Sequence, residues 1–230
     1  MHAILITPQE RVYEVHNGRY VHYVLIANDI AVPQNDPKTV KAAKASPDWL
    51  MWKQAMEAEK KSLAQLGTWT VLNGTAPRRP VKCKWVFLRK FNNGVLEKYK
   101  ARLVACGYSQ RYGIDYQEVF APVLRLESFR VVVSIAAWEG LAMNHLDVST
   151  AFLHGVLSDD ERIYMRLTPD FGADATGRPR DVLLNRSIYG LKQASRKWNK
   201  ELDRVFKSFG FNKKNYSDAC LYTLTKGDSK

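Results

Sequence analysis

The sequence predicts a globular protein of the α+β class. Two segments, 46–67 and 191–211, repeat apolar residues at helical spacing, and short β-branched or aromatic runs between them are typical of strands. Of the 230 residues, 46% are hydrophobic, which is enough to bury a core and excludes a wholly disordered chain. There is no run of 18 uncharged apolar residues, so no membrane-spanning helix is expected.

Residues 1–45 are expected to form a poorly ordered connector. Residues 29–46 are polar, interrupted by proline and rich in alanine and lysine. The first residues do not resemble a secretory signal, because Gln9, Glu10 and Arg11 directly follow a short apolar stretch. The folded part is therefore predicted to span residues 46–230.

The first helix is predicted to begin at Ser46, which is a good cap residue and is followed by proline in the first turn. Apolar residues then recur at near-helical spacing up to Gly67, which can end the helix: Trp49, Trp52, Met56, Leu63 and Leu66. A tryptophan-rich stripe of this kind favours core packing over a binding role.

The next elements are strands. Residues 68–72 are short and β-branched, and the runs 82–88 and 99–104 flank the turn signal Asn92-Asn93-Gly94, which predicts a β-hairpin. Alternation along the second run, from Lys98 to Arg102, places its cations on one face.

Six elements are predicted in the rest of the chain. Residues 127–140 indicate a buried helix, although the three valines at 131–133 also fit a strand. An amphipathic helix is predicted over 191–209. The expected strands are 144–148, 162–166 and 181–184, with a further strand beginning at 221–224.

The positive charge is concentrated in two segments. The net charge is +12, but residues 78–104 contribute +8 and residues 186–214 contribute +7, which leaves −3 for the remainder. Two basic blocks on a slightly acidic chain indicate contact with a polyanion, because each neutralised phosphate releases counterions. The alternative from charge alone is two solvated faces.

The three cysteines are widely spaced and odd in number: Cys83, Cys106 and Cys220. This favours a reducing compartment and argues against a disulfide framework or a zinc cluster. None of the five histidines lies beside a cysteine at metal-ligand spacing.

Asp147 is the most informative acid. It ends a predicted strand, and a carboxylate there could hold a metal ion from a rigid element. A capping or surface role is the commoner one for a single aspartate.

Eight ordered segments give the sequence a recognisable pattern: CKWVF at 83–87, KYKARLVA at 98–105, GYSQ at 107–110, GIDY at 113–116, FAPV at 120–123, LDVSTAFLHG at 146–155, IYM at 163–165 and YGLKQASRKWN at 189–199. Over residues 47–225 the chain resembles the reverse transcriptase of copia-type LTR retrotransposons. The resemblance implies a right-hand polymerase fold, of which this chain would form the fingers and part of the palm, an antiparallel sheet with packed helices.

The resemblance also implies an activity and its partners. The parent protein would synthesise DNA on an RNA template by two-metal nucleotidyl transfer with Mg²⁺, the primer 3′-hydroxyl attacking the α-phosphate. Its partners would be an RNA template, a DNA primer, deoxynucleoside triphosphates and the remainder of the Pol polyprotein, with no membrane. An intracellular, cytoplasmic location in a retroelement particle is expected.

Particular residues match the family's functional positions. By resemblance, Asp147 is the catalytic palm aspartate that binds both metal ions, with the Val148 carbonyl beside it. Phe152 matches the aromatic ring that stacks under the deoxyribose and excludes a 2′-hydroxyl. Gln193 matches the glutamine that lines the nucleotide pocket.

The remaining site residues are basic. Arg102, together with Lys90 or Lys98, matches the fingers cations that close on the triphosphate, a role that suits both the arginine fork and the lysine point charge. Contact with nucleic acid is assigned to Lys84, Arg89, Lys100, Arg196, Lys197 and Lys200.

The family's second carboxylate pair lies in a Tyr-x-Asp-Asp turn, and no such turn follows Tyr222 in this sequence. Asp159 and Asp160 lie in a different loop and are expected to be solvated. The chain is therefore expected to be truncated before that hairpin and to be catalytically inactive or nearly so. The alternatives are a non-catalytic nucleic-acid-binding remnant of a degraded element, or a truncated palm that does not fold stably.

Overall fold

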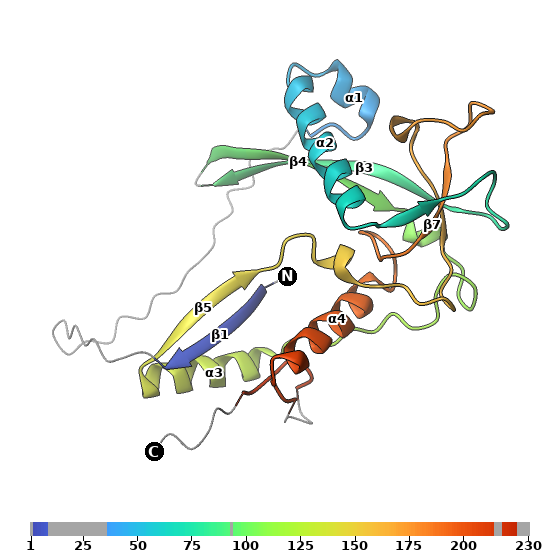
Figure 1. Cartoon of the computed structure of the whole chain (residues 1–230). Coiled ribbons are helices and arrows are strands. Elements are labelled where there is room, and N and C mark those ends of the chain that lie inside the picture. The colour runs from blue at the N-terminus through green and yellow to red at the C-terminus, as the bar shows by residue number, and fades with distance from the viewer. Residues whose placement is uncertain (1, 9–35, 93, 214–217, 225–230) are drawn as a thin grey trace. The chain divides into compact units, whose positions relative to one another are not determined.

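The protein is described by a computed structural model, which covers residues 2–8, 36–92, 94–213 and 218–224 (Figure 1). Contacts divide the chain into two compact units. The small unit comprises Met1–Ala31, Val123–Ser149 and Lys213–Lys230, and the large unit comprises Val32–Pro122 and Thr150–Asn212. The mixed helix and strand content confirms the predicted α+β class.

The large unit is built on a five-stranded sheet in the order β2-β7-β6-β3-β4. Its strands are β2 (Trp69–Val71), β3 (Val81–Asn92), β4 (Val95–Ala105), β6 (Tyr164–Arg166) and β7 (Asp181–Leu184). All neighbouring strands are antiparallel except β3 and β6, which run parallel. The sheet is therefore mixed, and the prediction of an antiparallel sheet was wrong.

The predicted hairpin is confirmed, with longer strands than the sequence indicated. Strands β3 and β4 pair from Cys83 opposite Ala105 to Asn92 opposite Val95, and the register shifts between Lys90 and Phe91. Gly94 closes the turn with φ of 78°, a conformation that favours glycine.

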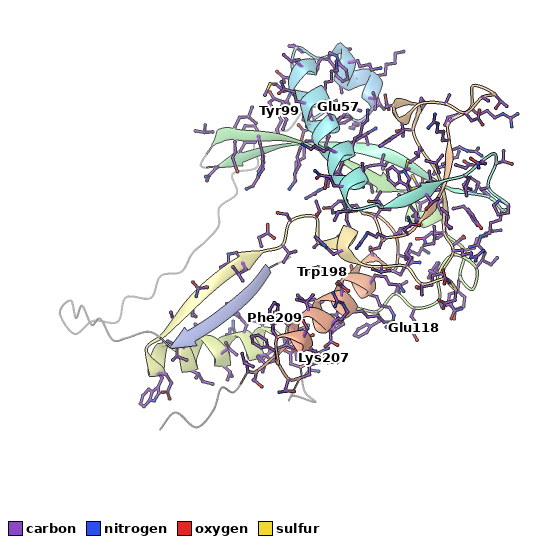
Figure 2. The ribbon with its side chains drawn as sticks, viewed as in Figure 1. Glu57, Tyr99, Glu118, Trp198, Lys207 and Phe209 are labelled. Atoms are coloured by element: carbon purple, nitrogen blue, oxygen red, sulfur yellow. The ribbon has the colours of Figure 1, made fainter. Side chains whose placement is uncertain are left out.

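Helix α2 (Trp49–Gln65) covers the hairpin and explains the tryptophan stripe. Trp52 is fully buried, and its ring meets the rings of Phe87 and Tyr99 edge-on, at centroid distances of 5.3 and 4.6 Å. Figure 2 shows Tyr99 on the hairpin beside α2. The stripe therefore packs into the core, as predicted.

The other helices of the large unit are α1 (Val40–Ala45) and α4 (Ala194–Ser208), together with the 3₁₀ turns Gly107–Ser109, Ala151–His154 and Pro169–Phe171. Helix α4 packs against the turn Ala151–His154, where the centroids of the Trp198 and His154 rings lie 6.2 Å apart. Figure 2 shows Trp198 in the first half of α4 and Lys207 near its C-terminal end.

The small unit contains β1 (His2–Pro8), β5 (Leu141–Asp147) and α3 (Leu126–Glu139). Strands β1 and β5 are antiparallel, with His2 opposite Asp147, and α3 contacts β5 (Figure 1). Helix α3 ends at Gly140, whose φ of 62° permits the left-handed cap. The predicted strand at 221–224 is absent, since only Thr223 makes a β-bridge there.

The connector prediction for residues 1–45 differs from the structure at both ends. Strand β1 and helix α1 both lie inside this segment, and they belong to different units. Residues 9–35 lie outside the described residues. Among the helices that the structure describes, none is both long enough and apolar enough to cross a membrane.

Candidate functional site

Arg102 and Phe152, two of the predicted nucleotide-binding residues, are linked through a third side chain, Tyr189. The guanidinium carbon of Arg102 lies 4.9 Å from the centroid of the Tyr189 ring. The Tyr189 ring in turn meets the Phe152 ring edge-on, with centroids 5.5 Å apart and an angle of 81° between their planes. All three side chains are half-buried, so they form a connected row at the surface of the large unit.

The backbone around Tyr189 is held against the end of β4. The Ala105 N–H donates a 2.8 Å hydrogen bond to the Tyr189 carbonyl. Gly190 follows with φ of 86°, and a Cβ there would lie 2.2 Å from the Ala105 carbonyl oxygen. Only glycine permits this approach, which sets the Tyr189 ring beside the strand of Arg102.

The same segment also holds the turn that contains Phe152. The Ser187 hydroxyl donates to the Phe152 carbonyl, and the Ser187 N–H donates a 2.7 Å hydrogen bond to the Gly155 carbonyl. Residues 187–190 therefore connect β4 to the turn Ala151–His154.

Gln193 lies inside the protein, whereas the sequence predicted that it lines the nucleotide pocket. Its side chain is 0% exposed. Its Oε1 accepts a 3.0 Å hydrogen bond from Nε2 of Gln110, and its Nε2 donates a 2.9 Å hydrogen bond to the Asp115 carbonyl. Gln110 Oε1 also accepts from the Lys192 N–H at 2.8 Å. This paired amide network, whose member Gln110 was not predicted, joins the loop after β4 to the start of α4.

The cations of the hairpin lie mostly on one face. Residues directly opposite each other in an antiparallel pair share a face, and the pairs Lys84–Val104, Val86–Arg102, Leu88–Lys100 and Lys90–Lys98 alternate with the core-facing pairs. Lys84, Lys90, Lys98, Lys100 and Arg102 therefore form what we call the cationic face. This arrangement agrees with the predicted alternation.

Lys90 and Lys98 face each other near the hairpin tip and share one acid. Their side chains are 53% and 52% exposed, and their ammonium groups lie 2.9 and 3.7 Å from the Glu97 carboxylate. The hydrogen bond from Lys90, aided by the charge of Lys98, lowers the pKa of Glu97. The two lysines are thus equivalent in position, and either could approach a triphosphate.

Arg89 lies on the opposite, core-facing side of the hairpin. It forms ion pairs with Asp48 at 2.6 Å and Asp36 at 3.6 Å, and its guanidinium lies over the rings of Trp52 and Tyr99 at 5.5 and 5.7 Å. These contacts tie the start of α2 to the sheet. A contact between Arg89 and nucleic acid, as predicted from the sequence, would have to replace these ion pairs and ring contacts.

The predicted nucleic-acid residues of α4 differ in their surroundings. Lys200 is exposed and Arg196 is half-buried beside Glu118, with which it forms an ion pair. Lys197 is only 7% exposed and forms an ion pair with Glu161, so it does not lie on the outer face. Burial opposes ionisation of Glu161, but the hydrogen bonds from Lys197 and Ser158 outweigh it and lower the pKa of Glu161.

Lys197→Met is expected to destabilise the protein by about 1–3 kcal/mol, because it leaves the partly buried Glu161 carboxylate without its cation. Lys200→Met, on the same helix but exposed, should change the unfolding free energy by less than about 0.5 kcal/mol. Urea denaturation followed by tryptophan fluorescence measures both. Equal midpoints for the two variants would show that the Lys197–Glu161 pair contributes nothing.

The same pair predicts a pH dependence. The folded-state pKa of Glu161 lies below its ordinary 4.5, so the stabilisation is present at neutral pH and is lost as the pH falls through and below that value. We expect the wild type to lose more unfolding free energy than Lys197→Met between pH 6 and pH 3 (about one and a half units on either side of the ordinary value). Parallel pH profiles would contradict this.

Asp147 and Val148 lie in the small unit. Asp147 is exposed at the end of β5, and Val148 is half-buried. Magnesium sites often use one or two carboxylates together with substrate phosphates, and an exposed carboxylate next to a backbone carbonyl provides donors of that kind. Within the described residues, no group of three or more His, Cys, Asp or Glu side chains could hold a metal ion.

Comparison with known proteins decides the family. Residues 66–230 match the model of the family described as reverse transcriptase (RNA-dependent DNA polymerase). The chain belongs to this family. The domain is 41% identical to the retrovirus-related Pol polyprotein from transposon TNT 1-94 of Nicotiana tabacum over 212 residues, and 42% identical to that from transposon RE2 of Arabidopsis thaliana over 182 residues.

These alignments cover 90% and 77% of this reverse transcriptase chain but 15% and 12% of the two polyproteins. The chain therefore spans a small part of the length of the curated relatives that it matches. The resemblance to retrotransposon Pol sequences is confirmed. No solved structure matches the fold.

Proposed function

We propose that this reverse transcriptase domain binds the incoming deoxynucleotide and the template–primer for RNA-directed DNA synthesis, as fingers and part of the palm of a right-hand polymerase. The observation that best supports this is the row of Arg102, Tyr189 and Phe152, which shares Arg102 with the cationic face. Such a row offers a forked cation for a triphosphate and an aromatic ring for a sugar within one surface.

Each residue has a proposed part in binding. Arg102, with Lys90 or Lys98, neutralises the triphosphate, while the Phe152 ring stacks under the deoxyribose and excludes a 2′-hydroxyl. Gln193 acts from inside by fixing the start of α4. Asp147, with the Val148 carbonyl, is the proposed ligand of Mg²⁺, which when bound stabilises the charge that develops on the phosphates during nucleotidyl transfer.

Nucleotide selectivity tests this proposal. The chain should bind dGTP more tightly than GTP in the presence of Mg²⁺, and Phe152→Ala should reduce that preference by about tenfold, because the excluded volume under the sugar is lost (about 1–2 kcal/mol). Equilibrium titration gives the four dissociation constants. If the wild type shows no preference, a non-catalytic nucleic-acid-binding module, which the same cations would favour, describes the chain better.

The cationic face and Lys200 are proposed to contact the phosphates of an RNA–DNA duplex. Affinity should fall steeply between about 50 and 200 mM salt, with little sequence preference. Lys84→Gln and Lys100→Gln should each lower the slope of log K against log salt by about 1. The matched control is Lys61→Gln, an exposed lysine on α2 outside both basic blocks.

Two results would contradict the assignment of that face. One is an affinity that does not respond to salt, since a phosphate contact must release counterions. The other is an equal loss in Lys61→Gln and the cationic-face variants, which would reflect net charge alone.

A further inference from the structure

We propose that Tyr189 is a positioning residue that holds the triphosphate-binding Arg102 and the sugar-selecting Phe152 in one arrangement. Nucleotide affinity and discrimination against ribonucleotides would then depend together on a side chain that need not touch the nucleotide. This inference rests on the proposed function of Arg102 and Phe152.

The ring of Tyr189 contacts both partners through different interactions. Arg102 lies over the ring, 4.9 Å from its centroid, where the negative face of the π-system attracts a guanidinium. Phe152 meets the ring at 81°, the edge-to-face geometry that aromatic pairs prefer. One ring can therefore restrict the rotamers of both partners.

Tyr189 suits this role because its own backbone is fixed from two sides. Its carbonyl accepts the Ala105 N–H, three residues after Arg102 on the same strand. Two residues earlier, Ser187 is bonded to the Phe152 carbonyl and to the Gly155 carbonyl. The segment that positions the ring is thus bonded to the strand of Arg102 and to the turn of Phe152.

Gly107 and Gly190 lie so close to neighbouring backbone that neither position has room for a Cβ. A Cβ on Gly107 would lie 2.0 Å from the Gly190 carbonyl oxygen, and one on Gly190 would lie 2.6 Å from Cγ1 of Val104. The backbones at 107, 190 and the end of β4 are therefore packed so closely that the segment cannot move nearer to β4, while the Ala105–Tyr189 hydrogen bond opposes movement away from it. A change in the ring alone should alter Arg102 and Phe152 and leave the backbone in place.

The experiment compares three variants by equilibrium titration with dGTP and GTP. Tyr189→Leu removes the π-system and should weaken dGTP binding by about fivefold, the effect of one cation–π contact, while also lowering the dGTP preference. Tyr189→Phe keeps the ring and should stay within about twofold of the wild type, since the ring face that attracts the guanidinium remains.

The matched control is Tyr164→Leu. It removes another arginine–tyrosine contact of the large unit, in which the Arg78 guanidinium lies 5.4 Å from the Tyr164 ring. It should leave both the dGTP affinity and the preference unchanged. If thermal melting shows that Tyr189→Leu is unfolded, Tyr189→Met gives the same comparison with a flexible apolar side chain.

The outcomes separate this inference from the function on which it rests. A wild type that binds dGTP and GTP equally overturns the proposed function, and this inference with it. A wild type that prefers dGTP, with Tyr189→Leu or Tyr189→Met showing the same affinity and preference, overturns only the role of Tyr189. Loss of affinity with an unchanged preference also overturns it, because the ring would then act on Arg102 alone.

Discussion

Gly190→Ala is expected to destabilise the protein by about 3–5 kcal/mol, a large fraction of the unfolding free energy of an ordinary domain (about 5–15 kcal/mol). Gly190 has φ of 86°, a conformation that a residue with a Cβ adopts only with strain. The new methyl would also lie 2.2 Å from the Ala105 carbonyl oxygen and 2.6 Å from Cγ1 of Val104.

The clash cannot be relieved by a side-chain rotation. The nearest atom belongs to the backbone of β4, and the Ala105 N–H is bonded to the Tyr189 carbonyl at 2.8 Å. Moving the strand end away would break that bond and separate Arg102 from Tyr189. The large unit must therefore lose packing whether the end of β4 or the segment at Gly190 moves to make room for the methyl group.

Gly177→Ala separates the two causes. Gly177 has a similar φ of 77°, but nothing lies within 4 Å of a Cβ built there. It should cost only the strain of the left-handed conformation, about 1–2 kcal/mol. Urea denaturation followed by tryptophan fluorescence measures both variants, and equal losses would show that the contact with β4 is unimportant.

Elements defined by local patterns were predicted well from the sequence. Helix α2 and the hairpin β3–β4 follow from apolar spacing and a turn signal, which act over short distances along the chain. The predicted cap was wrong, because Ser46 ends α1 and α2 begins at Trp49 after Asp48. The parallel pairing of β3 with β6 was missed because it joins Val81 to Met165, and nothing local in either strand specifies that partner. The same reason explains why β1 was missed, since its partner is β5.

The candidate site was predicted less completely than the fold. The resemblance provided Arg102 and Phe152, but Tyr189 was assigned no role although it begins one of the matching segments. A tyrosine next to a glycine gives no sign in sequence that an arginine from a distant strand lies over its ring. Only the register of β4 against residues 187–190 brings them together.

The sequence contained a weak indication that Lys197 is buried, but counting charges over residues 186–214 did not take it into account. It lies three residues after Ala194 and beside Trp198, on the flank of the apolar stripe of α4. A lysine in that position is either paired or directed outward along the helix. Its partner Glu161 comes from a loop 36 residues earlier in the sequence, so the sequence could not distinguish the two cases.

Asp147→Asn is expected to remove the dependence of nucleotide binding on Mg²⁺. For the wild type we expect dGTP to bind about 10–100-fold more tightly with Mg²⁺ than with a chelator, and for the variant we expect the two affinities to agree. Asparagine keeps the shape of the side chain but loses the charge that attracts a hard cation. Asp147 is exposed at the end of β5, and thermal melting of the variant shows whether it is folded before its Mg²⁺ dependence is read.

Asp159→Asn is the control for charge. Asp159 is also exposed and lies in the loop after Gly155, so the substitution removes the same charge from a residue without a proposed metal role. Its Mg²⁺ dependence should match the wild type, because Mg²⁺ binding depends on a particular carboxylate and a general change in net charge is screened by salt. If both variants lose the tighter dGTP binding with Mg²⁺ equally, Asp147 acts only through the net charge of the protein and not as a ligand of the ion. If Asp147→Asn keeps the full effect, the ion is held by the phosphates and other residues, and the proposed role of Asp147 is wrong.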